Sequence, residues 1–267
     1  MTDSREALKK ALENAVRNAV SGKPFAIAFS GGLDSGIVAA IAKEHAKEPI
    51  LYTVGSIDSY DVREARSSAG ELGMKWVHIP ITEDDVLKGL KEMIRITGTR
   101  DPVTLSFEIP LFFVLKDCTE EEVISGQGAD ELFAGYSKYI GLNEEDLKER
   151  MAEDMRKLSG VTLLHEKKIA EHFGKRIHYP FLDGKVIEAA GCLELDAVAP
   201  SDGPLTRKKP LREVSDLIGY PNISAKEKKA AQYGSGTMAL IKNICKKKGV
   251  TYVELIDELS REVLHDG

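Results

Sequence analysis

Cysteine is scarce in this chain. The three cysteines among its 267 residues, Cys118, Cys192 and Cys245, are widely spaced, and no Cys-x-x-Cys pair exists. Neither a zinc site built on paired cysteines nor a redox dithiol is therefore indicated. We expect the three thiols to be buried or inert.

Long apolar runs and excess positive charge are also missing. The longest nearly unbroken apolar run, Ile109 to Leu115, is far too short to cross a bilayer, and the first residues lack the apolar core of a signal peptide. The net charge is −6, whereas general nucleic-acid binders are usually basic. These absences predict a cytoplasmic protein with neither a membrane nor a nucleic acid as partner.

Strand and helix patterns alternate in the first half of the chain. A helix over about 4–21 precedes expected strands at 25–29, 49–54, 75–79 and 122–124, which alternate with helices at 36–47, 62–72 and 86–95. This alternation predicts an α/β fold: a parallel twisted sheet with helices on both faces. Beyond about residue 140 we see only helical patterns, at 147–158, 163–173, 184–191, 211–218, 238–247 and 252–263. We therefore expect a nucleotide-binding α/β part over about 1–140 and a helical substrate part over about 141–267.

The strongest motif is Ser-Gly-Gly-Leu-Asp-Ser, residues 30–35, between an expected strand and an expected helix. A helix amino terminus offers unpaired N–H groups to phosphate oxygens, and Gly31 and Gly32 let the backbone approach closely. Ser30 and Ser35 add hydroxyl groups. Asp34 would repel phosphate directly, so its presence predicts Mg²⁺ between the two.

The loop lacks the Gly-Lys-Ser/Thr ending of a Walker A motif, so no lysine reaches the phosphates from within it. It resembles instead the PP-loop of N-type ATP pyrophosphatases, which split ATP between the α- and β-phosphates. That resemblance implies the adenine nucleotide alpha hydrolase-like fold.

A second motif narrows the resemblance. Residues 125–136, Ser-Gly-Gln-Gly-Ala-Asp-Glu-Leu-Phe-Ala-Gly-Tyr, are similar to the signature of the synthetase domain of asparagine synthetases. Three further segments are similar to that family in the same order: Tyr-Pro-Phe-Leu-Asp at 179–183, Lys208 with Leu211 and Arg212, and the stretch from Lys228 to the Gly-Ser-Gly-Thr tail at 234–237. The last tail also resembles that of β-lactam synthetases. The resemblance covers about residues 20–245.

The resemblance implies a role for each motif. Asp34 and Asp130 would hold Mg²⁺, and Lys228 would stabilise negative charge on the reacting groups. The ATP site would further include Ser125 and Gly126 on the opposite wall, with Phe29 and Val54 flanking the adenine. For Asp183 we prefer a helix cap to a catalytic role.

Two departures from the family pattern matter. Residue 2 is Thr where the family has a nucleophilic cysteine, and about two dozen residues precede the first expected strand, so we expect no built-in glutaminase. Gln127 stands where many synthetases have a glutamate, and an amide cannot take a proton from ammonium. Glu166 is the nearest replacement, although its position in the sequence favours an exposed helix acid.

These observations predict an ATP-dependent amide ligase resembling asparagine synthetase. It would adenylylate a side-chain carboxylate, with aspartate the foremost candidate, and ammonia would attack the product; catalysis would rest on Lys228, Asp130, Gln127 and Glu166. Ammonia would come from solution or from a separate glutaminase subunit, and a homodimer is left open. The alternatives are a PP-loop sulfur transferase or tRNA-modifying enzyme, and a nucleotide-binding subunit of a larger amidotransferase.

Overall fold

A five-stranded parallel sheet forms the centre of the protein. The computed structural model describes residues 4–20, 23–200, 206–226 and 231–265. The strands are β1 (Phe25–Ala28), β2 (Ile50–Gly55), β3 (Lys75–Pro80), β4 (Glu122–Ile124) and β5 (Arg176–His178), in the order β3-β2-β1-β4-β5. Every neighbouring pair is parallel, as the sequence predicted.

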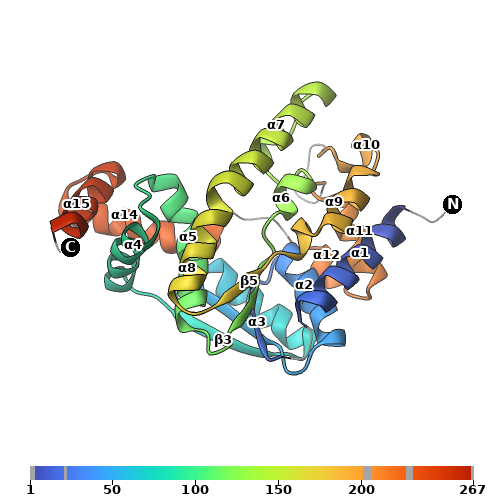
Figure 1. Ribbon diagram of the computed structural model, residues 1–267, viewed down its shortest axis with the longest axis horizontal. Coiled ribbons are helices and arrows are strands. Elements are labelled where there is room, and N and C mark those ends of the chain that lie inside the picture. Colours follow the sequence, from blue (N-terminus) through green and yellow to red (C-terminus); the bar gives the residue numbers. More distant parts are fainter. Residues whose placement is uncertain (1–3, 21–22, 201–205, 227–230, 266–267) are drawn as a thin grey trace.

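Helices cover both faces of this sheet (Figure 1). One layer contains α1 (Ser4–Ala19), α2 (Leu33–His45), α3 (Tyr60–Leu72), α9 (Gly184–Gly191), α11 (Lys209–Leu217) and α12 (Pro221–Ser224). The other contains α4 (Glu83–Thr97), α5 (Pro102–Asp117), α8 (Leu163–His172), α14 (Thr237–Lys248) and α15 (Tyr252–His265). Between or beyond these lie α6 (Ala129–Leu132), α7 (Glu144–Lys157), α10 (Leu195–Val198) and α13 (Ala231–Gly234).

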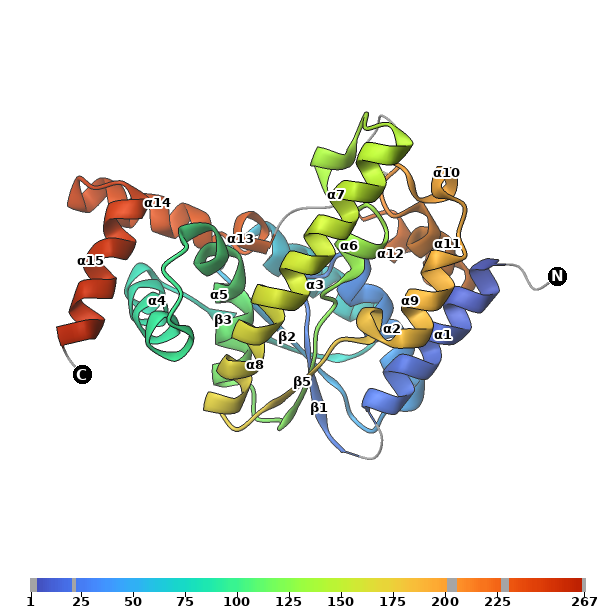
Figure 2. The ribbon, with the colours of Figure 1, turned by 45° about the horizontal axis from the view of Figure 1, so that its top comes forward.

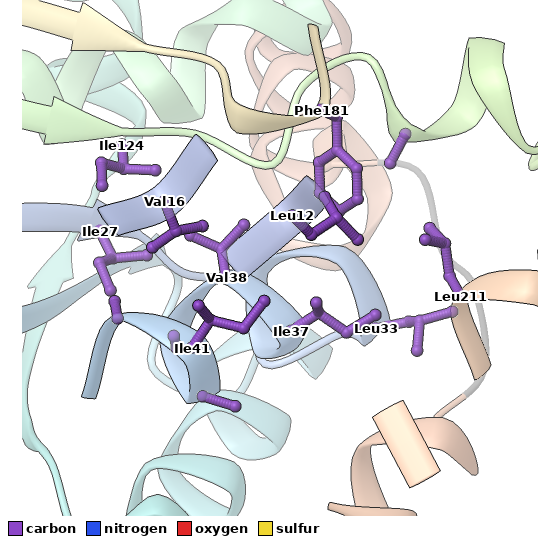
Figure 3. Packing of buried hydrophobic residues seen from close by; sticks show 14 of the residues in the cluster. Leu12, Val16, Ile27, Leu33, Ile37, Val38, Ile41, Ile124, Phe181 and Leu211 are labelled. Carbon is purple, nitrogen blue, oxygen red and sulfur yellow. The ribbon is translucent and has the colours of Figure 1, made fainter. Parts of the chain in front are cut away.

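The side chains of β1 alternate between the two layers. Phe25 and Ile27 are buried in the first, while Ala26 is buried in the second. Both faces of the strand are therefore apolar, which is typical of a parallel sheet covered by helices. Figure 3 shows Ile27 and Ile124 of adjacent strands meeting Val16 of α1 and Val38 and Ile41 of α2 in this core.

Among the elements that were not expected from the sequence, two shape the sheet and the cleft. The first is β5, which lies beyond residue 140 and completes the sheet, so the expectation that strands end there was wrong. It has only three residues, too few for period-2 alternation to show. The second is α5, whose buried residues include the continuous run Phe112–Leu115 and which contains Pro110 inside the helix. A helix is usually recognised in a sequence by a stripe of apolar residues and by the absence of an internal proline. This segment has neither feature.

None of the helices in the described ranges combines the length and apolar character that crossing a bilayer requires.

Candidate active site

A cleft of about 420 Å³ opens at the carboxyl ends of β1, β2 and β4. The chain runs from β1 outward to β2 and β3, and then returns to the other side of β1 as β4 and β5. The loops after β1 and β4 therefore diverge, and in open α/β sheets such a point is where ligands bind. The cleft is bordered by ten of the residues that the sequence singled out: Phe29, Ser30, Asp34, Ser35, Val54, Ser125, Gly126, Gln127, Asp130 and Glu166.

The loop after β1 presents free backbone donors. Helix α2 begins at Leu33, and the residue before it, Gly32, supplies no side-chain cap, so the first N–H groups remain available for an anion. Ser35 Oγ accepts from the N–H of Ser30 at 3.2 Å, and Ser30 Oγ accepts from the N–H of Gly32 at 3.3 Å. These contacts hold the loop closed around the helix terminus.

Gly31 also has a role in the fold. Its φ is +74°, and a Cβ at this position would lie 2.3 Å from the backbone N of Ala65. The glycine is therefore required because the loop packs directly on α3, independently of any phosphate. Gly31 and Gly32 line a smaller cavity that adjoins the main cleft.

Lys208 joins the two aspartates predicted to hold a metal ion. Its Nζ lies 2.5 Å from Asp34 Oδ2 and 2.8 Å from Asp130 Oδ1. Only 2% of the residue is exposed, so the ammonium has left water and depends on these carboxylates. Lys208 also has a φ of +58°, an uncommon conformation for a residue with a side chain. The structure thus places a third charged group where the sequence suggested only two.

The loop after β4 closes the opposite wall. A Cβ on Gly126 would lie 3.2 Å from Asp34 Cβ, so the two loops approach each other closely at this point. Ser125 Oγ accepts from the N–H of Gln127 at 3.3 Å. The two loops and the aspartate pair therefore form one continuous rim along the sheet edge.

The strand ends form the inner part of the cleft. Phe29 and Val54 are buried and border it, as expected. Thr53 donates from Oγ1 to the carbonyl of Phe29 at 2.5 Å and accepts from Trp76 Nε1 at 2.9 Å. Apolar residues of α5, among them Phe107 and Leu111, face this region. An apolar slot with a few polar groups suits a flat aromatic ring.

Glu166 is buried, so the expectation of an exposed helix acid was wrong. Only 3% of the residue is exposed, and burial raises the pKa of its carboxyl to about 8, with the Tyr179 hydroxyl opposing the shift in part and Glu131 adding to it. A π-helical turn, Leu158–Thr162, joins α7 to α8 and lies just before it. Figures 1 and 2 show α7 and α8 nearly in line. Such turns are frequent at functional sites.

A small cationic cavity of about 50 Å³ adjoins the main cleft, with which it shares Ser30, Asp34 and Asp61. Arg207, Lys208, Arg212 and Lys226 line it together with residues of the first loop and with Tyr60, Asp61 and Glu64 of α3. Lys226 Nζ lies 2.8 Å from Glu64 Oε2. Arg212 donates from Nε to the carbonyl of Arg207 and from Nη1 to the carbonyl of Lys226, at 3.0 Å each. Arg207 Nε, by contrast, is buried without a hydrogen-bond partner among the described residues. An unpaired buried donor beside a helix amino terminus is suited to an anion.

Sequence reasoning did not propose Arg207 and Lys226 for the site. It noted Lys208 only as part of a family pattern. Arg207, Lys208 and Lys226 are far from the first loop along the chain, so no local sequence pattern links them to it. Only the fold brings these residues to the loop. Lys228, the predicted catalytic lysine, lies outside the described residues; its neighbours Lys226 and Ala231 border the small cavity and the main cleft respectively.

The Gly-Ser-Gly-Thr tail packs at the end of β2. Ser56 donates its N–H to the carbonyl of Ser235 at 3.1 Å, and a Cβ on Gly234 would lie 2.0 Å from Asp61 Oδ1. The glycines therefore allow a close approach between segments about 180 residues apart.

Asp183 caps α9 by accepting from the N–H of Lys185 at 2.9 Å, which agrees with its predicted role.

The donor set fits a magnesium ion carried by phosphates. Asp34 Oδ1 is buried and has no hydrogen-bond partner among the described residues, so a lone pair remains for a cation. In the ranges that the structure describes, no group of three or more His, Cys, Asp or Glu side chains forms a metal cage. Mg²⁺ commonly takes one or two protein carboxylates and completes its shell with water and substrate phosphates.

The cysteines take no part in this site. Cys118 and Cys245 are buried, and burial raises the pKa of both thiols, so they are poor nucleophiles. Cys192 is exposed and does not border the cleft. The structure therefore gives no support to a sulfur-transfer site.

Comparison with known proteins identifies the family. The model of the asparagine synthase family matches residues 7–144, which include both loops of the cleft. The chain belongs to this family. A putative glutamine-hydrolysing asparagine synthetase 1 of Methanocaldococcus jannaschii is 29% identical, over 90% of this chain and 51% of its own length. The glutamine-hydrolysing asparagine synthetase 3 of Arabidopsis thaliana is 25% identical, over 81% of this chain and 44% of its own.

The chain thus spans about half the length of the curated relatives it matches. Among solved structures, an NMN synthetase from Francisella tularensis has a TM-score of 0.47 and 15% identity, covering 97% of this chain and 87% of its own. An ammonia-dependent NAD synthetase from Campylobacter jejuni has a TM-score of 0.35 and 17% identity, covering 85% and 99%. At these scores we draw nothing about function from either.

Proposed function

We propose that this chain is an ATP-dependent amide ligase that adenylylates a side-chain carboxylate, with aspartate the foremost candidate, releases pyrophosphate and forms the amide with ammonia. The observation that carries the proposal is the convergence of Asp34, Asp130 and Lys208 between the two loops of the cleft. A carboxylate attacking a phosphate brings two anions together, so the site must supply positive charge.

The residues divide the work between the main cleft and the small cavity beside it. Phe29 and Val54 receive the adenine in the apolar slot, and the open N–H groups at the start of α2 bind the phosphate chain. Mg²⁺, when bound, neutralises phosphate charge and makes pyrophosphate a better leaving group. Asp34 and Asp130 hold it, while Arg207, Lys208 and Lys226 receive the pyrophosphate in the small cationic cavity.

The second half of the reaction needs a proton acceptor. Gln127 can orient the acceptor by hydrogen bonding but cannot take a proton. Glu166 borders the same cleft and is buried, and we assign it the role of taking the proton from the attacking amine. Lys228 stabilises the charge that develops during acyl transfer.

Ammonia comes from solution or from a separate glutaminase. The chain acts without membrane or nucleic acid, in the cytoplasm, and a homodimer is compatible with this scheme. The purified protein should be tested for pyrophosphate release from ATP and Mg²⁺ with aspartate, with and without ammonium chloride. Asparagine formed together with pyrophosphate supports the proposal, whereas no pyrophosphate with aspartate or any other carboxylate contradicts it.

A further inference from the structure

Three titratable side chains lie at and beside the wall of the cleft. Glu108 of α5 has 1% of its surface exposed, and His165 Nδ1 of α8 lies 3.3 Å from its Oε1. Glu166 follows His165 along α8 and is buried as well. Glu108 Oε2 and Glu166 Oε2 are both without a hydrogen-bond partner among the described residues. Two buried carboxyls with open oxygens are costly unless at least one holds a proton.

These side chains extend from the cleft toward the surface. Glu166 borders the cleft, while Glu108 and His165 do not. The His165 side chain is 14% exposed, so it reaches water, whereas that of Glu108 is fully buried. The order is therefore a cleft-facing carboxyl, a buried carboxyl and a partly exposed imidazole.

Burial, aided by nearby negative charges, keeps protons on the carboxyls. Burial is the main cause that raises the pKa of Glu108 to about 9, and the negative charges of Glu166 and Asp101 add to it. Burial lowers the pKa of His165, with Lys168 adding to the shift. Glu131 of α6 further raises the pKa of Glu166, whereas the hydroxyl of Tyr179, in the segment after β5, lowers it. At neutral pH the imidazole is therefore uncharged and can accept a proton.

We propose that Glu108 and His165 form a proton exit that returns Glu166 to its carboxylate form between turnovers of the proposed ligase. The inference rests on the proposed function. When an amine attacks the acyl-adenylate, the new C–N bond forms, the bond to AMP breaks and the nitrogen passes one proton to Glu166. Glu166 passes this proton to Glu108 while Glu108 passes its own to His165 Nδ1, and the imidazole releases its Nε2 proton to water. Proton exchange of the partly exposed imidazole with water then restores the Nε2–H tautomer for the next turnover. Glu108 and His165 act through Glu166 and are positioning residues.

The relay predicts a pH dependence confined to one step. Amine attack needs Glu166 as carboxylate, and the fraction in that form increases with pH through about 8. Amide formation should therefore accelerate between about pH 7 and 9. Adenylylation, which transfers no proton through these groups, should not follow the same curve.

The buried proton can be tested without turnover. At pH 7 the wild-type protein should show an infrared C=O stretch from the protonated carboxyl of Glu108. The Glu108→Gln variant should lose this band. The control variant Glu120→Gln, at another buried glutamate, should retain it. The NMR titration midpoint of His165 should move in Glu108→Gln but not in Glu120→Gln. An ionised Glu108 at pH 7, or an unmoved His165 midpoint, overturns the relay even if the ligase reaction itself is not found.

The kinetic test separates the two steps. ATP–pyrophosphate exchange with aspartate measures adenylylation, and asparagine formation with ammonium chloride measures the whole reaction. Glu108→Gln should leave exchange within about twofold of wild type and slow amide formation about tenfold or more. His165→Gln should do the same, which covers the case that one variant folds poorly. Normal exchange with unchanged amide formation and pH profile in both variants excludes the relay.

Discussion

Lys208 Nζ lies 2.5 Å from Asp34 Oδ2, although 174 residues separate them along the chain. The same nitrogen is 2.8 Å from Asp130 Oδ1, so one buried ammonium lies between two carboxylates from different loops. Two carboxylates this close would repel each other without a cation. Lys208 therefore fixes the spacing of the pair, and a metal ion held by the same two carboxylates would share that place with it.

Replacing Lys208 by methionine should damage both stability and activity. The variant keeps a long apolar stem but leaves two partly buried carboxylates without the buried cation that pairs them. Breaking a buried ion pair typically costs about 3–5 kcal/mol. Pyrophosphate exchange should fall at least about 100-fold. Lys209→Met, at the exposed neighbour, is the matched control and should behave as wild type. Equal loss in both variants, in thermal melts and in exchange assays, would argue against a specific role for Lys208.

Gly135 offers a second test of the same cluster. A Cβ here would lie 1.9 Å from Asp130 Oδ1 and 2.1 Å from Lys208 Cε, so an added methyl group forces the ion pair apart. We expect Gly135→Ala to lose about 1–3 kcal/mol of stability through overpacking and to weaken ATP binding. Gly160→Ala adds a methyl where nothing lies within 4 Å and should be close to neutral. Calorimetric titration of both variants with ATP and Mg²⁺ measures the difference.

The predicted catalytic lysine can be tested against its neighbour. Lys228→Ala should abolish asparagine formation while ATP still binds, because its predicted role is to stabilise charge in the reaction rather than to bind the nucleotide. Lys229→Ala should retain activity, since we expect that residue to be solvated. A Lys228→Ala protein with wild-type turnover would show that the family pattern was carried over to the wrong position.

The sheet could be predicted because its first four strands carry local signals. Phe25–Ala28 and Ile50–Gly55 are short apolar runs that precede glycine- or serine-containing turns, and each is followed by a helical pattern. β5 carried no such signal. Its identity as a strand depends on cross-strand pairing with β4, where Glu122 meets Arg176 and His178, and that pairing cannot be read from either segment alone.

The site could be predicted only where its residues lie within motifs. The loops after β1 and β4 each contribute residues in sequence, so Asp34 and Asp130 were found and their convergence follows from the sheet. Glu108 lies in a helix that had no periodic signal, and nothing local indicates that it faces His165. The burial of Glu166 likewise depends on how α8 packs against α5, which no pattern within α8 specifies.

The carboxylate of Glu122 should stabilise β5, and this stabilisation should be lost when acid protonates the carboxylate. Its carboxylate accepts from Arg176 and lies 2.8 Å from His178 Nε2, and these hydrogen bonds lower its pKa to about 2. Because the folded pKa is below the unfolded value, the stabilisation is present above about pH 4.5 and is lost as the pH falls toward 2. Glu122→Gln should thus lower stability by about 1–3 kcal/mol at pH 7 and by much less at pH 3. Glu121→Gln, at an exposed neighbour that also pairs with Arg176, should change it little.

Glu108 should have the opposite effect on stability. Its pKa is raised from 4.5 to about 9, so the folded protein binds a proton that the unfolded chain releases. Stability from this proton is fully present below about pH 4.5 and is lost as the pH rises to about 9. A glutamine cannot ionise, so Glu108→Gln should be more stable than wild type at pH 9, by on the order of a few kcal/mol, and similar to it at pH 5. Urea unfolding at the two pH values measures the difference, with Glu171→Gln on the exposed side of α8 as control. A variant whose advantage does not grow with pH would show that Glu108 is ionised in the native protein.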